Sequence, residues 1–168
     1  MLTATVTNTG AAPPTGRVVF SSGTTTLGGV QLDASGVATL TRANLGASLY
    51  PMVATYNGDS KNLSSASPVV NQVVNPTTSK ATLTSSANNP LSGVEVTFTA
   101  RITSPTVIPT GPVSFQVGNT VVGTAQLSGG KAEFTTSSLP LGVTVVTVTY
   151  AGNSNIQGSS ASVTETVR

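Results

Sequence analysis

Side chains that could carry out catalysis are scarce in this sequence. It contains no His and no Cys, and only five of its residues are acidic. General acid–base and nucleophilic catalysis need a poised acid, a base or an activated nucleophile. No two acidic residues are closely spaced, and no activating base stands beside the many Ser and Thr hydroxyls. We therefore predict that the chain is not an enzyme and binds no cofactor. The acidic residues are Asp33, Asp59, Glu95, Glu133 and Glu165.

The oxygen-rich stretch at residues 57–62 (NGDSKN) is the best candidate for a metal site. Carboxylate and amide oxygens, such as those of Asn57, Asp59 and Asn62, are ligands that Ca²⁺ prefers. The alternative is an ordinary turn, because Asn and Asp next to Gly are common turn formers. A similar stretch further along the chain has Asn153 in place of Asp59, which leaves little negative charge to hold a cation. We favour the turn and keep calcium as the weaker alternative.

Two tyrosines, Tyr56 and Tyr150, end similar runs of alternating residues. An exposed aromatic ring could stack on a sugar, but a single aromatic residue per module is weak support for a carbohydrate-binding site. A buried Tyr that ties its hydroxyl to nearby backbone is a common feature of β-sandwiches. We predict this structural role for both tyrosines.

The charged residues favour neither nucleic acid nor a membrane as partner. Seven Lys and Arg against five Asp and Glu give a net charge of +2, spread along the chain. Nucleic-acid-binding proteins gather their cations on one face, often with aromatic residues between them, and aromatics are only 4% here.

No apolar run is long enough to span a bilayer, and residues 1–6 read as a strand, not as a secretory leader. Without Cys, no disulfide can hold the fold, which must rest on apolar burial and hydrogen-bond ladders.

An internal repeat sets the domain organisation. Residues 14–20 (PTGRVVF) return as residues 109–115 (PTGPVSF), and residues 54–59 (ATYNGD) return as residues 148–153 (VTYAGN). Such self-similarity is the mark of tandem structural units. We predict one module at residues 1–75 and a second at residues 76–168. Between them, Pro76 restricts its own φ and the conformation of Asn75, so the joint should be short and semi-stiff.

Short runs of alternating apolar and polar residues, separated by turn residues, predict β-strands. No segment carries apolar residues at helical spacing over more than two turns without Gly, Pro or a β-branched run. About seven strands in about 90 residues suit an immunoglobulin-type sandwich. The fold class is therefore predicted as all-β, with two tandem immunoglobulin-like β-sandwiches. The predicted core consists of Val18, Phe20, Leu40, Met52 and Tyr56 in module one and Val113, Phe115, Phe134, Val146, Val148 and Tyr150 in module two.

The repeated motifs follow one order in both modules: Pro-Thr-Gly, Val-x-Phe, Leu-Gly or Val-Gly, Gly-x-Ala, and Tyr-x-Gly-Asp/Asn before a Ser-rich turn. They occupy about residues 14–67 and 109–161. This string resembles the bacterial immunoglobulin-like repeats of large cell-surface and secreted proteins. The resemblance implies a non-catalytic spacer or stalk outside the cell, with neighbouring repeats of the parent chain as partners.

The same resemblance leaves two other functions open. One is adhesion to a host protein or a glycan through variable loops such as residues 21–25 and 60–67. The other is an accessory part of a secreted hydrolase. Some surface modules of this architecture also carry a Lys–Asn isopeptide bond beside an acidic residue, and Lys80 and Glu165 could lie on neighbouring strands. We expect an ordinary ion pair there.

Two positions depart from the family pattern. Leu2 aligns with Phe98, so module one has no counterpart of residues 79–96, which predicts a missing first strand and an open sheet edge. Either a preceding segment was cut away, which we favour, or another chain supplies the strand. Pro51 stands where module two has Val145, and a Pro in a central strand predicts a local bulge or an unpaired side.

Overall fold

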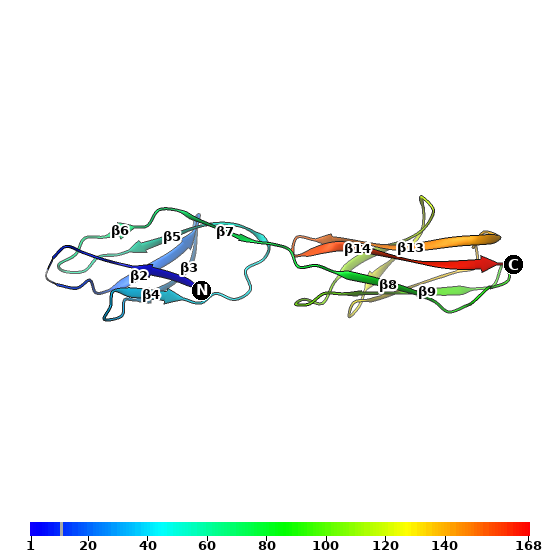
Figure 1. The fold of residues 1–168 in the computed structure, drawn as a ribbon, viewed down its shortest axis with the longest axis horizontal. Helices are drawn as coiled ribbons and strands as arrows, with labels where there is room; N and C mark the ends of the chain where they lie inside the picture. Colours follow the sequence, from blue (N-terminus) through cyan, green and yellow to red (C-terminus); the bar gives the residue numbers. More distant parts are fainter. Residues whose placement is uncertain (11) are drawn as a thin grey trace. The chain divides into compact units, whose positions relative to one another are not determined.

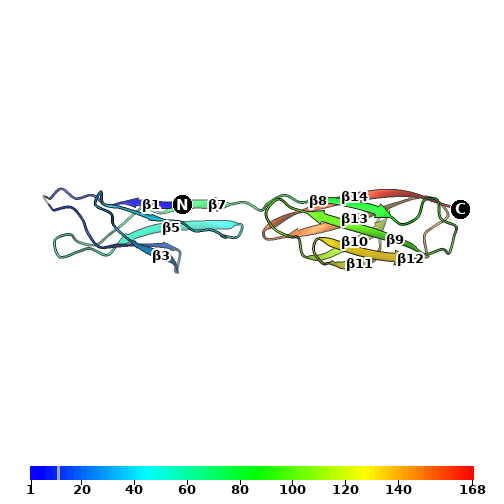
Figure 2. The same cartoon turned by 90° about the horizontal axis from the view of Figure 1, so that it is seen from below.

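The computed structural model describes residues 1–10 and 12–168. Within them, strands are the only long regular elements, as expected from the many Val and Thr residues and the frequent turn residues. The chain divides into two compact units, Met1–Asn75 and Pro76–Arg168, called module one and module two below (Figures 1 and 2). The described residues contain no helix long and apolar enough to cross a membrane.

Module two is a sandwich of two antiparallel sheets. One sheet has the strand order β11-β10-β13-β14, and the other has the order β12-β9-β8. Strands β13 and β14 form the longest hairpin, coloured orange to red in Figure 1. The bounds are β8 (Lys80–Ser85), β9 (Val96–Thr103), β10 (Gly111–Val117), β11 (Thr120–Leu127), β12 (Lys131–Thr136), β13 (Gly142–Asn153) and β14 (Ile156–Val167).

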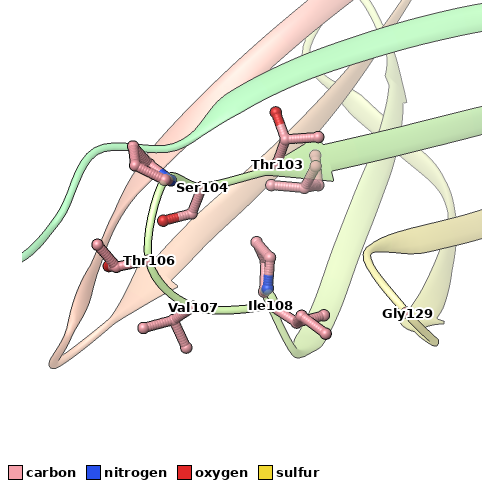
Figure 3. Close-up of a pocket in the computed structure, with 9 residues that line it drawn as sticks. Thr103, Ser104, Thr106, Val107, Ile108 and Gly129 are labelled. Atoms are coloured by element: carbon pink, nitrogen blue, oxygen red, sulfur yellow. The ribbon is translucent and has the colours of Figure 1, made fainter. Parts of the chain in front are cut away.

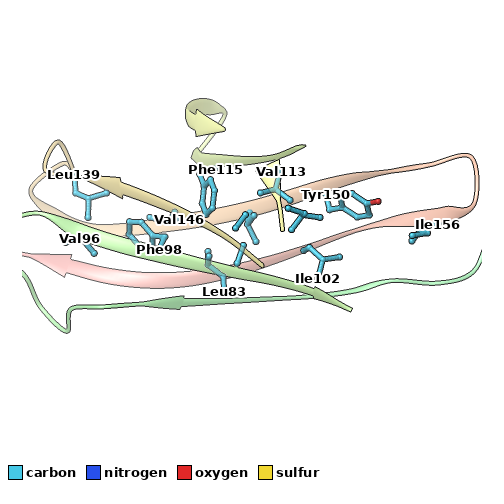
Figure 4. Close-up of a cluster of buried hydrophobic side chains, with 14 of the residues drawn as sticks. Leu83, Val96, Phe98, Ile102, Val113, Phe115, Leu139, Val146, Tyr150 and Ile156 are labelled. Carbon is cyan, nitrogen blue, oxygen red and sulfur yellow. The ribbon is translucent and has the colours of Figure 1, made fainter. Parts of the chain in front are cut away.

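The core of module two lies between these sheets (Figure 4). Alternate residues of β9 point inward, from Val96 to Ile102, and all are almost fully buried. They face inward residues of β10 and β13, including Phe115 and Tyr150. The period-2 pattern of the sequence is therefore the pattern of burial.

Module one repeats this plan with a smaller second sheet. In the larger sheet the order is β3-β2-β5, and both β6 and β7 pair with β5; the other sheet contains only β1 and β4. The bounds are β1 (Leu2–Thr5), β2 (Arg17–Ser22), β3 (Thr25–Gln31), β4 (Val37–Leu40), β5 (Ser48–Tyr56), β6 (Ser65–Ala66) and β7 (Val70–Val74).

The two smaller sheets correspond residue by residue. Leu2 of β1 pairs with Leu40, as Phe98 of β9 pairs with Phe134. In module two, β9 also pairs with β8 along its other edge. Module one has no counterpart of β8 among the described residues, so one edge of β1 is open.

Pro51 lies in β5, one residue beyond the end of the ladder that β5 forms with β2. Pairing of β5 with β2 ends at Met52 and Ser22, whereas pairing with β7 continues through Pro51 and Asn71. Neither ladder of β5 shows a register shift there. On the β2 side, the Pro51 carbonyl still accepts a long hydrogen bond from the Gly23 N–H (3.4 Å), although Pro51 has no N–H to donate.

The predicted core residues are buried, except for two that are only partly buried. Leu40 and Phe134 occupy equivalent places on β4 and β12 and pack against the edge of each core. Each covers a glycine of the opposite sheet, Gly28 or Gly123, whose missing side chain leaves room for it. Phe134 also stacks on Phe115, with ring centroids 5.2 Å apart.

The joint between the modules is short. Strand β7 ends at Val74, and Thr77 is already fixed to module two, because its N–H donates to the Asn155 carbonyl (2.9 Å) and its carbonyl accepts from the Gln157 N–H (2.8 Å). Only Asn75 and Pro76 lie between these anchors.

Candidate functional site

The repeated motifs meet at one end of each module, where a tyrosine closes the sandwich. The Tyr56 hydroxyl at the end of β5 donates to the Thr15 carbonyl (2.6 Å), just before β2. In module two, the Tyr150 hydroxyl donates to the Thr110 carbonyl (3.1 Å) in the same way. Each tyrosine is only 2% exposed, so its ring belongs to the core. We call this arrangement the tyrosine clasp.

Glycines with left-handed backbone make the clasp possible. Gly16, which follows Thr15, has a φ of +95°, and Gly111, which follows Thr110, has a φ of +100°. Residues with a Cβ rarely adopt this conformation. At Gly58 a Cβ would also lie 2.8 Å from the Asn62 carbonyl oxygen. The Pro-Thr-Gly and Tyr-x-Gly motifs are therefore repeated because of backbone geometry.

Asp59 is the hydrogen-bonding centre of the clasp in module one. Its Oδ1 accepts from the backbone N–H of Lys61 (2.8 Å) and of Asn62 (2.7 Å), and its Oδ2 accepts from the Thr15 N–H and hydroxyl (both 2.8 Å). The Asn62 side-chain amide adds a further donor at 3.0 Å. The N–H groups of Lys61 and Thr15, followed by the Asn62 amide, hold the pKa of Asp59 far below its usual range.

Module two builds the same turn with a neutral residue. The Oδ1 atom of Asn153 accepts from the N–H of Asn155 (2.9 Å) and of Ile156 (3.0 Å). Its side-chain amide lies 3.4 Å from the Tyr150 hydroxyl. An amide oxygen is therefore sufficient to organise this turn.

These contacts favour the turn over the calcium site. Both carboxylate oxygens of Asp59 already accept hydrogen bonds from protein donors, and the Asn62 Oδ1 accepts from the side-chain amide of Asn8 (2.6 Å). Asn57 is exposed, and its backbone N–H donates to the Arg17 carbonyl (3.1 Å). In the described part of the chain, no group of three or more His, Cys, Asp or Glu residues is placed to hold a metal ion.

The family model described as "Bacterial Ig-like domain (group 3)" matches residues 1–75 and 83–168, nearly the whole chain. The chain is a member of this family. The two matched regions follow the two modules, and each contains one tyrosine clasp. A search of curated protein sequences returns no match.

A solved structure of fibronectin(III)-like modules of Clostridium thermocellum CbhA is similar to this bacterial Ig-like pair. The sequence identity is 18%, the match covers 98% of this chain and 84% of that chain, and the TM-score is 0.45.

Acidic residues other than Asp59 are dispersed over this Ig-like pair. Asp33 accepts from the N–H groups of Ser35 and Val37 in a turn. Glu133 forms an ion pair with Lys131 (2.7 Å), which lowers the pKa of Glu133. These contacts of Asp33 and Glu133 are local, with partners at most four positions away along the chain.

Lys80 and Glu165 are not brought together. Ser79 bonds to Ser159 through their hydroxyls (2.8 Å), which places Lys80 beside the start of β14, whereas Glu165 lies near the end of that strand. Lys80 is exposed and Glu165 is only 3% exposed. The prediction of an ion pair between Lys80 and Glu165 is therefore wrong.

A hollow of about 350 Å³ lies beside the loop that joins β9 to β10 (Figure 3). It is lined by residues 102–109 and Gly129, none of which is charged. The Ser104 hydroxyl is buried there without a hydrogen-bond partner. Nothing in this lining could act as an acid or a base.

Two features of the clasp were not anticipated from the sequence. Asp59 is bonded to Thr15 of the loop between β1 and β2, and to Asn62 of its own turn. Asn8, from the same loop as Thr15, contacts Asn62. The repetition of Thr15 as Thr110 in the Pro-Thr-Gly motif is the signal that points to one of them. The position of Asn8, in contrast, depends on how the chain before β2 turns, which no local pattern specifies.

Proposed function

We propose that the chain is a non-catalytic spacer in a larger bacterial surface or secreted protein, with neighbouring Ig-like repeats as its partners. The observation that carries this proposal is the two-residue joint. Because the chain is fixed to module one up to Val74 and to module two from Thr77, little slack remains. A Pro in that joint restricts it further. Such a connection limits bending between two sandwiches, as a spacer requires.

The equivalence of the two modules also supports this role. Both keep the tyrosine clasp and its glycines, and they share no reactive group. The two loops that were candidates for adhesion have structural roles. Residues 21–25 form the tight turn between β2 and β3, and residues 60–67 begin in the turn that Asp59 organises. These observations favour a spacer over an adhesive module or an active part of a hydrolase.

Distance measurements between spin labels test the spacer role directly. The chain has no Cys, so Thr24→Cys and Ser137→Cys, both at exposed positions, would give one label in each module. We expect a narrow distance distribution that broadens strongly when four Gly residues are inserted between Asn75 and Pro76. If the native joint already gives a distribution as broad as the insertion does, the spacer proposal is wrong.

A further inference from the structure

Strand β11 forms an open edge of the larger sheet of module two. It pairs with β10 along one side, and no strand of the described chain pairs with its other side (Figure 2). Such an edge presents backbone N–H and C=O groups that can pair with another chain. Near the start of the strand, Val121 is 52% and Val122 is 40% exposed, and Thr124 and Gln126 are exposed further along.

Other edges of module two are blocked by charge or by a neighbouring segment. Strand β12 carries the exposed side chains of Lys131 and Glu133, and β8 begins with the exposed Lys80. Strand β14 is bonded to residues 77 and 79 near its start and packs against β8. Strand β11, in contrast, has no charged residue and no Pro. Charged residues and Pro are the usual devices that prevent pairing at an edge.

The equivalent edge of module one, β3, is guarded by Arg17. The Arg17 guanidinium donates to the Gly29 carbonyl (3.3 Å), and a Cβ on Gly29 would collide with this side chain. In module two the corresponding positions are Pro112 and Thr124. Both edge strands have the same register shift beside the Phe of the Val-x-Phe motif. The charge on the edge is therefore what distinguishes them.

The larger sheet of module two is almost free of charge. Its strands β10, β11, β13 and β14 contain one charged residue, Glu165, which is only 3% exposed. The other charged residues of this module lie on the smaller sheet or outside the strands. Two copies that meet along β11 therefore bring no like charges together, and like charges are what opposes the pairing of identical strands.

We propose that β11 is a self-association surface, at which the β11 strands of two copies of this chain pair antiparallel. A two-fold axis perpendicular to the sheets relates the copies, so each contributes the same edge and the contact is closed. The pairing joins two four-stranded sheets into one continuous sheet. This contact lies between separate molecules, and the proposal is independent of the spacer role.

The size of the contact sets the strength of the dimer. An edge of eight residues is small beside the roughly 1,200–2,000 Å² that a stable interface buries. We therefore expect a weak dimer, which forms at about 1 mM and dissociates at about 10 μM.

Sedimentation and amide hydrogen exchange over this concentration range test the proposal in the full chain. We expect the sedimenting mass to rise from monomer toward dimer as the concentration increases. Exchange of residues 120–127 should slow by at least about tenfold in the dimer, whereas exchange in β3 should stay unchanged.

A variant that copies the guard of β3 onto β11 gives a sharper test. We expect Pro112→Arg/Thr124→Gly to weaken association by at least about tenfold, because each edge then carries an Arg. The matched control is Val145→Arg, which adds the same charge to β13, an inner strand of the same sheet. Val145 is 47% exposed, and we expect this control to dimerise as the native chain does.

The single variant Thr124→Lys covers the case that the double variant fails to fold, because Thr124 is exposed. A native chain that stays monomeric at about 1 mM would overturn the proposal. So would a dimer that leaves exchange of residues 120–127 unchanged, or one that persists in Thr124→Lys at its native unfolding temperature. Protection of β11 by an added extended peptide, without any dependence on protein concentration, would make a foreign strand the occupant and would also contradict it.

Discussion

Asp59 and Asn153 organise the same turn with different charges. The carboxylate of Asp59 accepts hydrogen bonds from two loops, whereas the Asn153 amide oxygen accepts from its own turn only. A turn at these residues follows from the Asn, Asp and Gly content of the sequence. The repeat marks Thr15 as a structural position, but its bond to Asp59 depends on the tertiary approach of the loop before β2 and does not follow from local sequence.

Removal of the Asp59 acceptor should weaken module one. We expect Asp59→Ala to lower its unfolding temperature clearly, because the N–H groups of Thr15, Lys61 and Asn62 lose their acceptor. Asp59→Asn should lower it less, since Asn153 shows that an amide oxygen suffices for this turn. Calorimetry of both variants measures the difference. Equal losses for Ala and Asn would mean that the charge, not the acceptor, holds the clasp.

The pH dependence of stability should reflect the same carboxylate. Because folding lowers the pKa of Asp59, its contribution is complete above the unfolded-state value of about 4 and is lost as the pH falls below it. We expect urea unfolding of module one to show a steeper loss of stability from pH 5 to pH 2 in the native chain than in Asp59→Asn. Parallel pH profiles would contradict this assignment.

Calcium should not bind to the clasp. A cation at Asp59 would have to displace the backbone donors that already occupy its oxygens. We expect isothermal titration with Ca²⁺ to give no binding heat, and the unfolding temperature to be the same in Ca²⁺ and in a chelator. A saturable heat that disappears in Asp59→Asn would establish a calcium site.

At the scale of single elements, alternation in the sequence predicts the strands, because inward and outward residues obey the period of the pleat. Alternation does not predict how deeply an edge residue is buried. Leu40 and Phe134 have the inward phase but lie on the edge strands β4 and β12, and so they stay partly exposed. The room for them is made by Gly28 and Gly123 on the facing sheet, and sequence reasoning gave these glycines no role.

The contact between Gly123 and Phe134 should behave as a unit. A Cβ at Gly123 would collide with the Phe134 ring, so we expect Gly123→Ala to destabilise module two by about 1–3 kcal/mol. In a Phe134→Leu background the same substitution should cost much less, because the smaller side chain leaves space. Urea unfolding of the four proteins of this double-mutant cycle measures the coupling. Additive losses would contradict the packing explanation.

For the whole molecule, the repeat in the sequence predicts two similar units, and the motifs predict the family. Among the residues that the structure describes, module one has no counterpart of β8, which agrees with the alignment of Leu2 with Phe98. The attachment of Thr77 to module two, directly after the joint, does not follow from the sequence. Its hydrogen bonds to residues 155 and 157 depend on the β13–β14 turn lying beside it in the fold. The short joint on which the spacer role depends is therefore a property of the fold.

Backbone ¹⁵N relaxation of the native chain tests the central claim most directly. If Asn75 and Pro76 hold the two sandwiches together stiffly, both modules should tumble with the long correlation time of a 168-residue particle. A variant with four Gly residues inserted before Pro76 should show shorter and separate correlation times for the two modules. Native modules that tumble independently, each at the rate of its own size, would contradict the account.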